Sequence, residues 1–436
     1  MRSNKKQIRY VGVSSDTSLK TNSFLSNINK WIILFMCTWY SWPYFNYKLG
    51  VIPFLLILII WFFTTDYRWV FQRIPLDLVM VIIWAITFLP YILTGGFLYG
   101  IVDGKYVMIT FILFIGGIFI NHYYMYYNNN DLVLGKVAFF SILFYVIAST
   151  QTYLGLKDYP LAARGLATGS DPLQQTYLSL GIGGFGFVYS AVFINILILY
   201  FVIKKVQDVN KFYKILCLFI YIIITTMLIS ASYATAILVL LTGTLLIVMI
   251  KGKKSFIFCM ILVFLFLFLI NPIEMIGYFL IESAKLFKTN EVISSKFLDL
   301  AQGFVSESVG SQTSGRGQLY LASLETFLRN PIFGIYGPFG HDFKSEVGGH
   351  SGWLDLMAYY GLFGSLPLFI AIFLNFRKQL RFYASHPYFH VLLTAQLLFV
   401  IFGFINPIIY IYQIGFVLFV VGPSIPYLPY AFSKKS

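Results

Sequence analysis

The stretch GGHSGWLDLMAYYGLFG, residues 348 to 364, marks the point where a long polar segment gives way to an apolar one. His350 follows two glycines at this border, and the apolar residues beyond it continue to about residue 375. A helix needs about 20 apolar residues to cross the roughly 30 Å hydrocarbon core of a bilayer. The stretch therefore predicts that a membrane span begins close to His350.

The composition of the whole chain gives the same indication. Of its 436 residues, 58% are hydrophobic, 19% are aromatic and only 11% are charged. A water-soluble domain of this length needs more polar residues than this to cover its surface. We therefore expect an all-α polytopic membrane protein.

About twelve apolar runs have the length of a membrane span. Nine of them fall within residues 27–281, and three more fall within residues 351–425. The expected spans are 27–46, 49–65, 76–98, 105–122, 134–154, 176–203, 213–230, 232–250, 255–281, 352–375, 388–407 and 408–425. Short turns separate the seventh span from the eighth and the eleventh from the twelfth, so each of these two pairs is expected to form a hairpin.

The distribution of lysine and arginine predicts the orientation of these spans, because basic residues near span ends resist translocation. With a cytoplasmic N-terminus, most of the 31 basic residues fall in inside segments. The net charge of +14 is then explained by anionic inner-leaflet lipids, without nucleic acid as a partner. We expect cytoplasmic tails at 1–26 and 426–436, a short outside loop at 155–175 and one large outside loop at 282–350.

The large outside loop carries a clear helix signal in SGRGQLYLASLETFLRNPIFG, residues 314–334. Ser314 can cap this helix, and Asn330 should end it because the residue before a proline is pushed out of helical geometry. The predicted apolar stripe of this helix consists of Tyr320, Leu324, Phe327 and Leu328. Glycines follow at every third residue from Gly334, so the chain there can lie close to a ligand or to another backbone.

Two arginines in the outside segments are candidates for binding an anion. Arg316 lies in the first turn of the expected helix, where its guanidinium and the unpaired backbone amides can together bind a phosphate. A surface arginine without a ligand is the alternative interpretation, since a cation gains nothing from the helix dipole at this position. Arg164, in the short outside loop, presents the same choice between a bound anion and contact with lipid headgroups.

His350 is the candidate general base. Gly348 and Gly349 let the backbone turn before it, and Ser351 or His350 itself can cap the tenth span. The positive end of that helix disfavours imidazolium, so the ring is biased toward the neutral form that a base needs near pH 7. Asp355 either offsets the helix dipole or orients His350, and a hydrogen-bonded interfacial histidine is the alternative role for His350. No pair of histidines has the spacing of metal ligands, so no metal site is expected.

The segments SGRGQLYLASLETFLRNPIFGIYGPFG and HSGWLDLMAYYGLFG resemble the O-antigen ligase and Wzy-type polysaccharide polymerase superfamily of bacterial inner membranes. The shared pattern is an arginine-led helix, an asparagine–proline stop and a glycine-rich turn, followed by a histidine, a small polar residue, an aromatic residue, leucine and an acid. ARGLATGSDPLQQTYLSL is similar to an earlier outside arginine loop of that family, and ISASYATAILVLLTG to its serine-rich span start. This chain lacks the arginine that many members carry after those serines.

The resemblance implies a metal-independent, inverting glycosyltransferase without a cofactor, whose donor is a glycan on undecaprenyl diphosphate. His350 would deprotonate the acceptor hydroxyl, while Arg316 and Arg164 would bind the diphosphate and stabilise its departure. The supporting residues would be Ser351, Trp353 and Asp355. The implied location is the bacterial inner membrane, with cytoplasmic termini and a site in the periplasm. The implied partners are membrane lipids, the lipid-linked oligosaccharide and, by analogy, a chain-length regulator protein.

Two further functions remain as alternatives. Within the superfamily, a polymerase joins a lipid-linked repeat unit to the non-reducing end of another, whereas a ligase transfers the finished glycan to lipid A core or to a protein. The twelve expected spans and the phenylalanine- and tyrosine-rich remainder favour the polymerase of an O-antigen or capsule. A flippase or transporter for lipid-linked sugars is an alternative of another class. Transporters usually place charges inside the bundle, whereas nearly all charges here are expected at span ends.

Overall fold

The computed structural model describes residues 23–65, 74–98, 103–128, 130–168, 171–203, 211–249, 281, 284–285, 298, 301, 313–335 and 347–432. Within these ranges every regular element is a helix and no strand occurs. Six helices are long and apolar enough to cross a membrane, or seven if one bent pair counts as a single span. The prediction of an all-helical, membrane-embedded protein is therefore confirmed for the described part of the chain.

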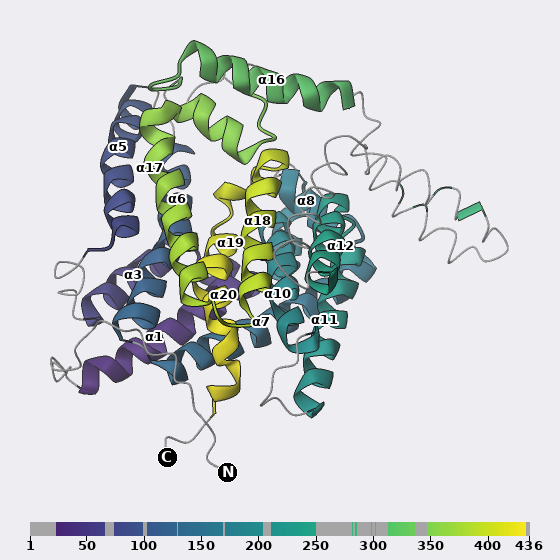
Figure 1. Cartoon of the computed structure of the whole chain (residues 1–436). Helices are drawn as coiled ribbons and strands as arrows, with labels where there is room; N and C mark the ends of the chain where they lie inside the picture. The colour runs from purple at the N-terminus through teal and green to yellow at the C-terminus, as the bar shows by residue number, and fades with distance from the viewer. Residues whose placement is uncertain are drawn as a thin grey trace.

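Most of the helices run side by side in a bundle, and α16 lies across one end of it (Figure 1). The longer helices are α1 (Ser23–Ser41), α5 (Leu76–Leu98), α6 (Asp103–Asn121), α7 (Asp131–Asp158), α10 (Phe185–Ile203), α11 (Lys211–Ser230), α12 (Ala234–Met249), α16 (Thr313–Arg329), α17 (Gly352–Phe382) and α18 (Phe389–Ile405). The shorter α-helices are α2 (Pro43–Leu49), α3 (Val51–Thr64), α8 (Ala162–Thr168), α9 (Gln174–Ser179), α19 (Tyr412–Phe416) and α20 (Gly422–Ser424). The π-helices are η1 (His122–Tyr127) and η4 (Val417–Val421), and the 3₁₀ helices are η3 (Ile408–Tyr410) and η5 (Ile425–Tyr430).

The structure does not show all twelve expected spans. α12 and α18, with 16 and 17 residues, are shorter than a full span. The expected ninth span, 255–281, lies outside the described residues except for residue 281. Twelve crossings therefore remain a prediction.

The first two expected spans, 27–46 and 49–65, are divided differently from the prediction. α1 ends at Ser41, and Pro43 begins the separate helix α2 at a position where its missing amide costs little. Gly50, at φ +73°, then separates α2 from α3, and these two helices are bent by 93°. A short helix, rather than a simple turn, therefore joins the first two expected spans.

The two predicted short connections are confirmed as breaks between helices. α11 ends at Ser230 and α12 begins at Ala234. α18 ends at Ile405, and Pro407 lies in the connection before Tyr412. The expected twelfth span, 408–425, is instead a run of short α, π and 3₁₀ helices whose candidate span covers Tyr412–Tyr430.

The expected tenth span, 352–375, is broken at Gly361, which has φ +60° and ψ −168° inside α17. The first part of α17 lies across the end of the bundle beneath α16, and the remainder runs along the bundle (Figure 1). The continuous span from residue 352 is therefore corrected to two helices that meet at this glycine.

The segment that follows α16 supplies backbone hydrogen-bond acceptors at the break in α17. The amides of Leu362 and Phe363 donate to the carbonyls of Pro331 and Ile332 at 2.8 and 2.9 Å. A side chain on Gly361 would collide with the Ile332 carbonyl. Because two backbones touch here, the expected close approach at the glycine-rich turn is confirmed for Gly334, whose own missing Cβ would meet the backbone of α17.

α16 ends at Arg329, as the Asn330–Pro331 stop predicted, but it begins at Thr313, so Ser314 lies inside the helix and is not its cap. The predicted apolar stripe is packed only in part: Tyr320 and Phe327 are half-buried, and the Tyr320 hydroxyl donates to the carbonyl of Ile405 at 3.2 Å. Ser323 and Thr326 are buried, whereas Leu324 and Leu328 are 37% and 64% exposed. The reason is that α16 packs on a polar segment, described below, rather than on an apolar surface.

Candidate functional site

Arg164 is held at the surface by the connection between α11 and α12. Its guanidinium donates to the carbonyl of Ser232 at 2.5 Å, and the Tyr233 hydroxyl donates back to the carbonyl of Ala163 at 2.7 Å. Ser232 has φ +56°, the only positive value at a non-glycine residue in the described ranges. The loop that carries Arg164 therefore contacts the serine-rich turn between α11 and α12. The sequence suggested these as two separate features.

An acidic residue lies close to the Arg164 helix. The Asp171 carboxylate accepts the amide of Leu173 at 2.8 Å and lies against Gly165, which leaves no room for a side chain there. This negative charge opposes anion binding near Arg164, so Arg164 by itself is a weak phosphate site.

The segment 347–351 is fixed to α16 by one buried hydroxyl. Ser323 accepts the amide of Gly348 at 2.9 Å and donates to Asp355 at 2.6 Å. The backbone of Gly348 lies against the carbonyl of Leu319, one turn earlier on α16. The polar face of α16 is therefore the face that holds this segment.

The same contact sets the turn that carries His350 against the helix that carries Arg316. Arg316 lies in the first turn of α16, three residues before Leu319, which is about 4.5 Å along a helix axis. Gly348, which touches Leu319, precedes His350 by two residues. The side chain of Arg316 lies outside the described residues.

Ser351 caps the first part of α17, and Asp355 completes the cap. The Ser351 hydroxyl accepts the amide of Leu354 at 3.2 Å, and Asp355 accepts the amide of Ser351 at 2.9 Å. Ser351 as cap was one of the two predicted assignments. Both carboxylate oxygens of Asp355 are thus bound by Ser323 and Ser351, which favours its helix-end role over an orienting role for His350.

His350 is exposed at the end of this segment. Gly349, immediately before it, has φ +73° and open space around its Cα. The backbone on either side is held through Gly348 and Ser351, so the imidazole is carried on a fixed turn at the surface. The imidazole is therefore at a position that a molecule outside the protein can reach.

Trp353 lies inside the protein. It is 7% exposed, its indole N–H donates to the carbonyl of Val400 at 2.7 Å, and a side chain on Gly403 would collide with its ring. Tyr360 is fully buried as well. Trp353 therefore packs α17 against α18 and supports a site only by positioning the helix that follows His350.

A chain of aromatic rings joins the two groups of candidate residues. Tyr189 of α10 has its ring centroid 5.7 Å from Tyr233, beside Arg164, and 5.0 Å from Phe402 of α18. Gly352 in turn donates its amide to the carbonyl of Asn406 at 3.2 Å. α8, which carries Arg164, and the start of α17, which follows His350, therefore lie at the same end of the bundle as α16, which we call the loop end (Figure 1).

No family model matches this chain, and no curated protein is similar to it in sequence. The resemblance to the ligase and polymerase superfamily therefore stays a prediction that rests on the motifs. Among the described residues, no three histidine, cysteine, aspartate or glutamate side chains gather as metal ligands would.

A second polar cluster, which the sequence did not predict, lies where the start of α5 packs against the later part of α17, remote from α16. Lys378 lies 3.5 Å from Asp77 and 2.8 Å from the Nδ1 atom of His122. Asn375 donates to Asp77 at 3.1 Å, and Asp77 is only 3% exposed. Each of these residues lies at or next to the end of a predicted span, so hydropathy alone gave no signal that they would contact one another.

Proposed function

We propose that the chain is a membrane-embedded glycosyltransferase that polymerises a bacterial surface polysaccharide, such as an O-antigen or capsule, from undecaprenyl-diphosphate-linked units. The observation that carries the proposal is the contact between Gly348 and Leu319, because it brings the turn that bears His350 beside the helix that bears Arg316. A base and a guanidinium on adjoining backbone segments suit a hydroxyl nucleophile and a diphosphate leaving group.

In the proposed reaction His350 accepts the proton of the acceptor hydroxyl as its oxygen forms a bond to the anomeric carbon of the donor. The bond from that carbon to the diphosphate breaks from the opposite face, which inverts the configuration. Arg316, aided by Arg164, stabilises the negative charge that develops on the departing undecaprenyl diphosphate. The site would face the periplasm, with both termini in the cytoplasm.

The decisive experiment uses purified protein and a synthetic undecaprenyl-diphosphate oligosaccharide. We expect wild type to make a ladder of longer lipid-linked glycans, and His350→Ala to lower its rate about 10²- to 10⁴-fold. His390→Ala serves as a matched histidine control and should keep full activity. A His350→Ala protein that remains folded and makes the same ladder would refute the catalytic role of His350.

The ligase is the first alternative, and it differs only in the acceptor. Transfer of the glycan to added lipid A core or protein, without a ladder, would assign the chain as a ligase. A chain-length regulator should alter the ladder when it is added and should leave single transfers unchanged.

A transporter for lipid-linked sugars is the second candidate, and one observation favours it. Asp77, Lys378 and His122 are gathered between helices of the bundle, and such charges in membrane proteins often lie on a substrate path. Movement of a fluorescent lipid-linked sugar across proteoliposomes, lost in Asp77→Asn but kept in His350→Ala, would establish transport in place of transfer.

A further inference from the structure

The turn that carries His350 is enclosed by a ring of three hydrogen bonds. The Gly348 amide donates to the Ser323 hydroxyl oxygen at 2.9 Å, and that hydroxyl donates to Asp355 at 2.6 Å. The second carboxylate oxygen of Asp355 accepts the amide of Ser351 at 2.9 Å, which closes the ring. Only two residues, one of them His350, lie between the two anchored amides. This hydrogen-bond ring therefore fixes the backbone on both sides of His350.

Ser323 is the member of the ring that joins α16 to α17. Its single proton has two acceptors within reach, Asp355 at 2.6 Å and the carbonyl of Leu319 at 3.3 Å. The shorter bond is made to a carboxylate, and such charge-assisted bonds are the stronger ones, so the proton lies toward Asp355. Ser323 is 0% exposed, and loss of its hydroxyl would leave a buried carboxylate oxygen and the Gly348 amide without this partner.

α16 has other attachments to the bundle that do not depend on Ser323. The segment after it is bound by backbone hydrogen bonds to the break in α17, and the Tyr320 hydroxyl donates to the carbonyl of Ile405 at 3.2 Å. The turn, in contrast, meets α16 where Gly348 lies against the carbonyl of Leu319, one helical turn before Ser323. Removal of the hydroxyl should therefore release the turn and leave the helix in place.

We propose that Ser323 is a positioning residue for the transfer reaction, and that it holds the turn so that His350 keeps one place relative to the helix of Arg316. The inference rests on the proposed function, which makes His350 the base. Ser323 acts through its hydrogen-bond partners and touches no reacting atom. A base displaced by about 1 Å loses about 10²-fold in rate, whereas binding of the diphosphate depends on the two arginines. The loss should therefore fall on kcat rather than on KM.

The first test measures the turn itself and does not depend on transfer. Hydrogen exchange of the full-length protein in detergent is followed by mass spectrometry on peptides that cover residues 347–351. In Ser323→Ala the Gly348 amide should exchange at least about tenfold faster, because it has lost its acceptor. Unchanged exchange in a folded Ser323→Ala protein would overturn the proposal.

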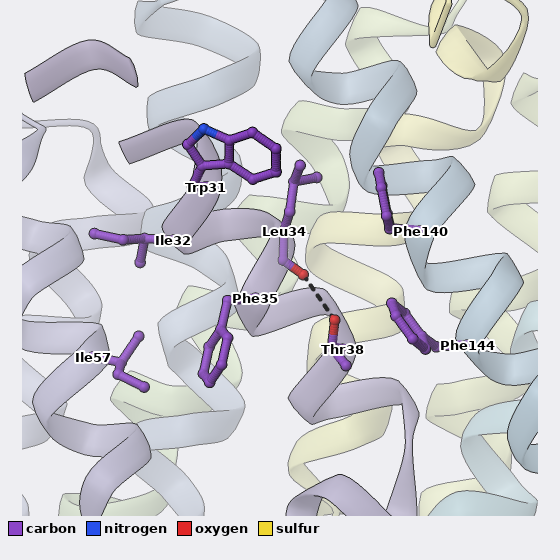
Figure 2. A pocket seen from close by; sticks show the side chains of 8 residues that line it. All are labelled: Trp31, Ile32, Leu34, Phe35, Thr38, Ile57, Phe140 and Phe144. Carbon is purple, nitrogen blue, oxygen red and sulfur yellow. Dashed lines mark hydrogen bonds between the residues drawn. The ribbon is translucent and has the colours of Figure 1, made fainter. Parts of the chain in front are cut away.

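Thr38→Val is the matched control for the loss of a hydroxyl. Thr38, on α1, lines an apolar groove between α1, α3 and α7 and donates to the carbonyl of Leu34 at 3.2 Å (Figure 2). It is not part of the hydrogen-bond ring, and valine keeps its shape. Exchange at residues 347–351 and glycan transfer should both stay as in wild type. A change equal to that in Ser323→Ala would show a general effect of lost hydroxyls and would overturn the proposal.

The second test separates positioning from packing through the kinetics of transfer. Ser323→Ala should lower kcat about 10²-fold and change the KM for the donor less than about threefold. Ser323→Thr and Ser323→Val have the same shape, but only threonine carries the hydroxyl, so the threonine variant should be at least about tenfold faster than the valine variant. Equal kcat values for these two variants, both folded, would assign the effect to packing and overturn the proposal.

The outcomes separate this inference from the proposed function. Faster exchange in Ser323→Ala, together with no glycan transfer by wild type, would keep Ser323 as the residue that fixes the turn and refute the reaction. Transfer by wild type that is equally fast in Ser323→Ala, together with unchanged exchange, would keep the reaction and refute the role of Ser323.

Discussion

At the loop end of the bundle, His350 is exposed on a turn and Arg164 donates to a backbone carbonyl, whereas Asp77, Lys378 and His122 contact one another between helices at the far end of α5 and α17. The far cluster extends through neutral side chains. Gln379 donates to Asn375 at 2.7 Å, and Gln396 donates to Gln379 at 2.9 Å.

Functional and structural polar residues of this protein can be distinguished by how they are held. Polar groups that satisfy one another in the core contribute to stability, and removing one leaves its partner buried without compensation. Polar groups that are held through backbone contacts and face outward can be changed with little loss of stability, and their loss should appear in activity. Four variants test this distinction.

Asp77→Ala should cost the most stability, about 3 kcal/mol, because it removes the buried carboxylate that Asn375 and the half-buried Lys378 ammonium both contact. Thermal unfolding in detergent measures the loss. The double variant Asp77→Asn with Lys378→Met removes both charges and should recover most of the stability that Asp77→Ala loses. The exposed pair Glu325 and Arg329, at 3.5 Å, is the matched control, and Glu325→Ala should change stability by less than about 1 kcal/mol.

Gly361→Ala should cost at least about 2 kcal/mol, because the new side chain adopts a disfavoured φ and collides with the Ile332 carbonyl. Gly349→Ala has a similar φ of +73° but open space, so it isolates the conformational part of the cost. Equal melting temperatures for the two variants would contradict the close packing of the two backbones.

Arg164→Lys should cost about 1 kcal/mol of stability by weakening the bond to the Ser232 carbonyl. If Arg164 also binds the diphosphate, the KM for the donor should rise about tenfold, since lysine cannot reproduce the planar fork of donors. Lys157→Ala, which removes an exposed cation from the same outside region, is the control for general charge effects. A stability loss without any change in KM would show that Arg164 stabilises the fold and does not bind the donor.

His386 should give the smallest effect, a loss of less than about 1 kcal/mol of stability on acidification. Its Nδ1 atom accepts the amide of Tyr388 at 3.2 Å, and burial lowers the pKa of the imidazole below its ordinary 6.5. The unfolded chain therefore binds the proton more readily, so the contribution is full above about pH 6.5 and is lost as pH falls below it. Melting curves from pH 7.5 to 5.5 should flatten in His386→Asn, whose amide oxygen can still accept from Tyr388.

Local signals in the sequence predicted much of the fold correctly. Apolar runs located the long helices, the Asn330–Pro331 pair located the end of α16, and Ser351 was one of two predicted caps for α17. These features depend on neighbours within a few residues. Their energetics are therefore visible in a single sequence.

The features that the sequence did not predict depend on residues far apart in the chain. Arg164 binds a carbonyl 68 positions away, and Asn375 donates to Asp77 across 298 positions. The break at Gly361 exists because an earlier segment supplies the carbonyls that its amides need. An aromatic-rich stretch with two glycines, Gly361 and Gly364, carries no local sign of this partner.

The close backbone contact between Gly334 and Gly361 also has a consequence for biogenesis. The part of α17 after Gly361 enters the bilayer with two amides whose acceptors, at Pro331 and Ile332, belong to a segment synthesised earlier. Hydrocarbon offers no substitute acceptor for them. In the proposed topology that earlier segment must first cross the membrane and then fold back, so correct insertion of this helix waits on translocation of the loop before it.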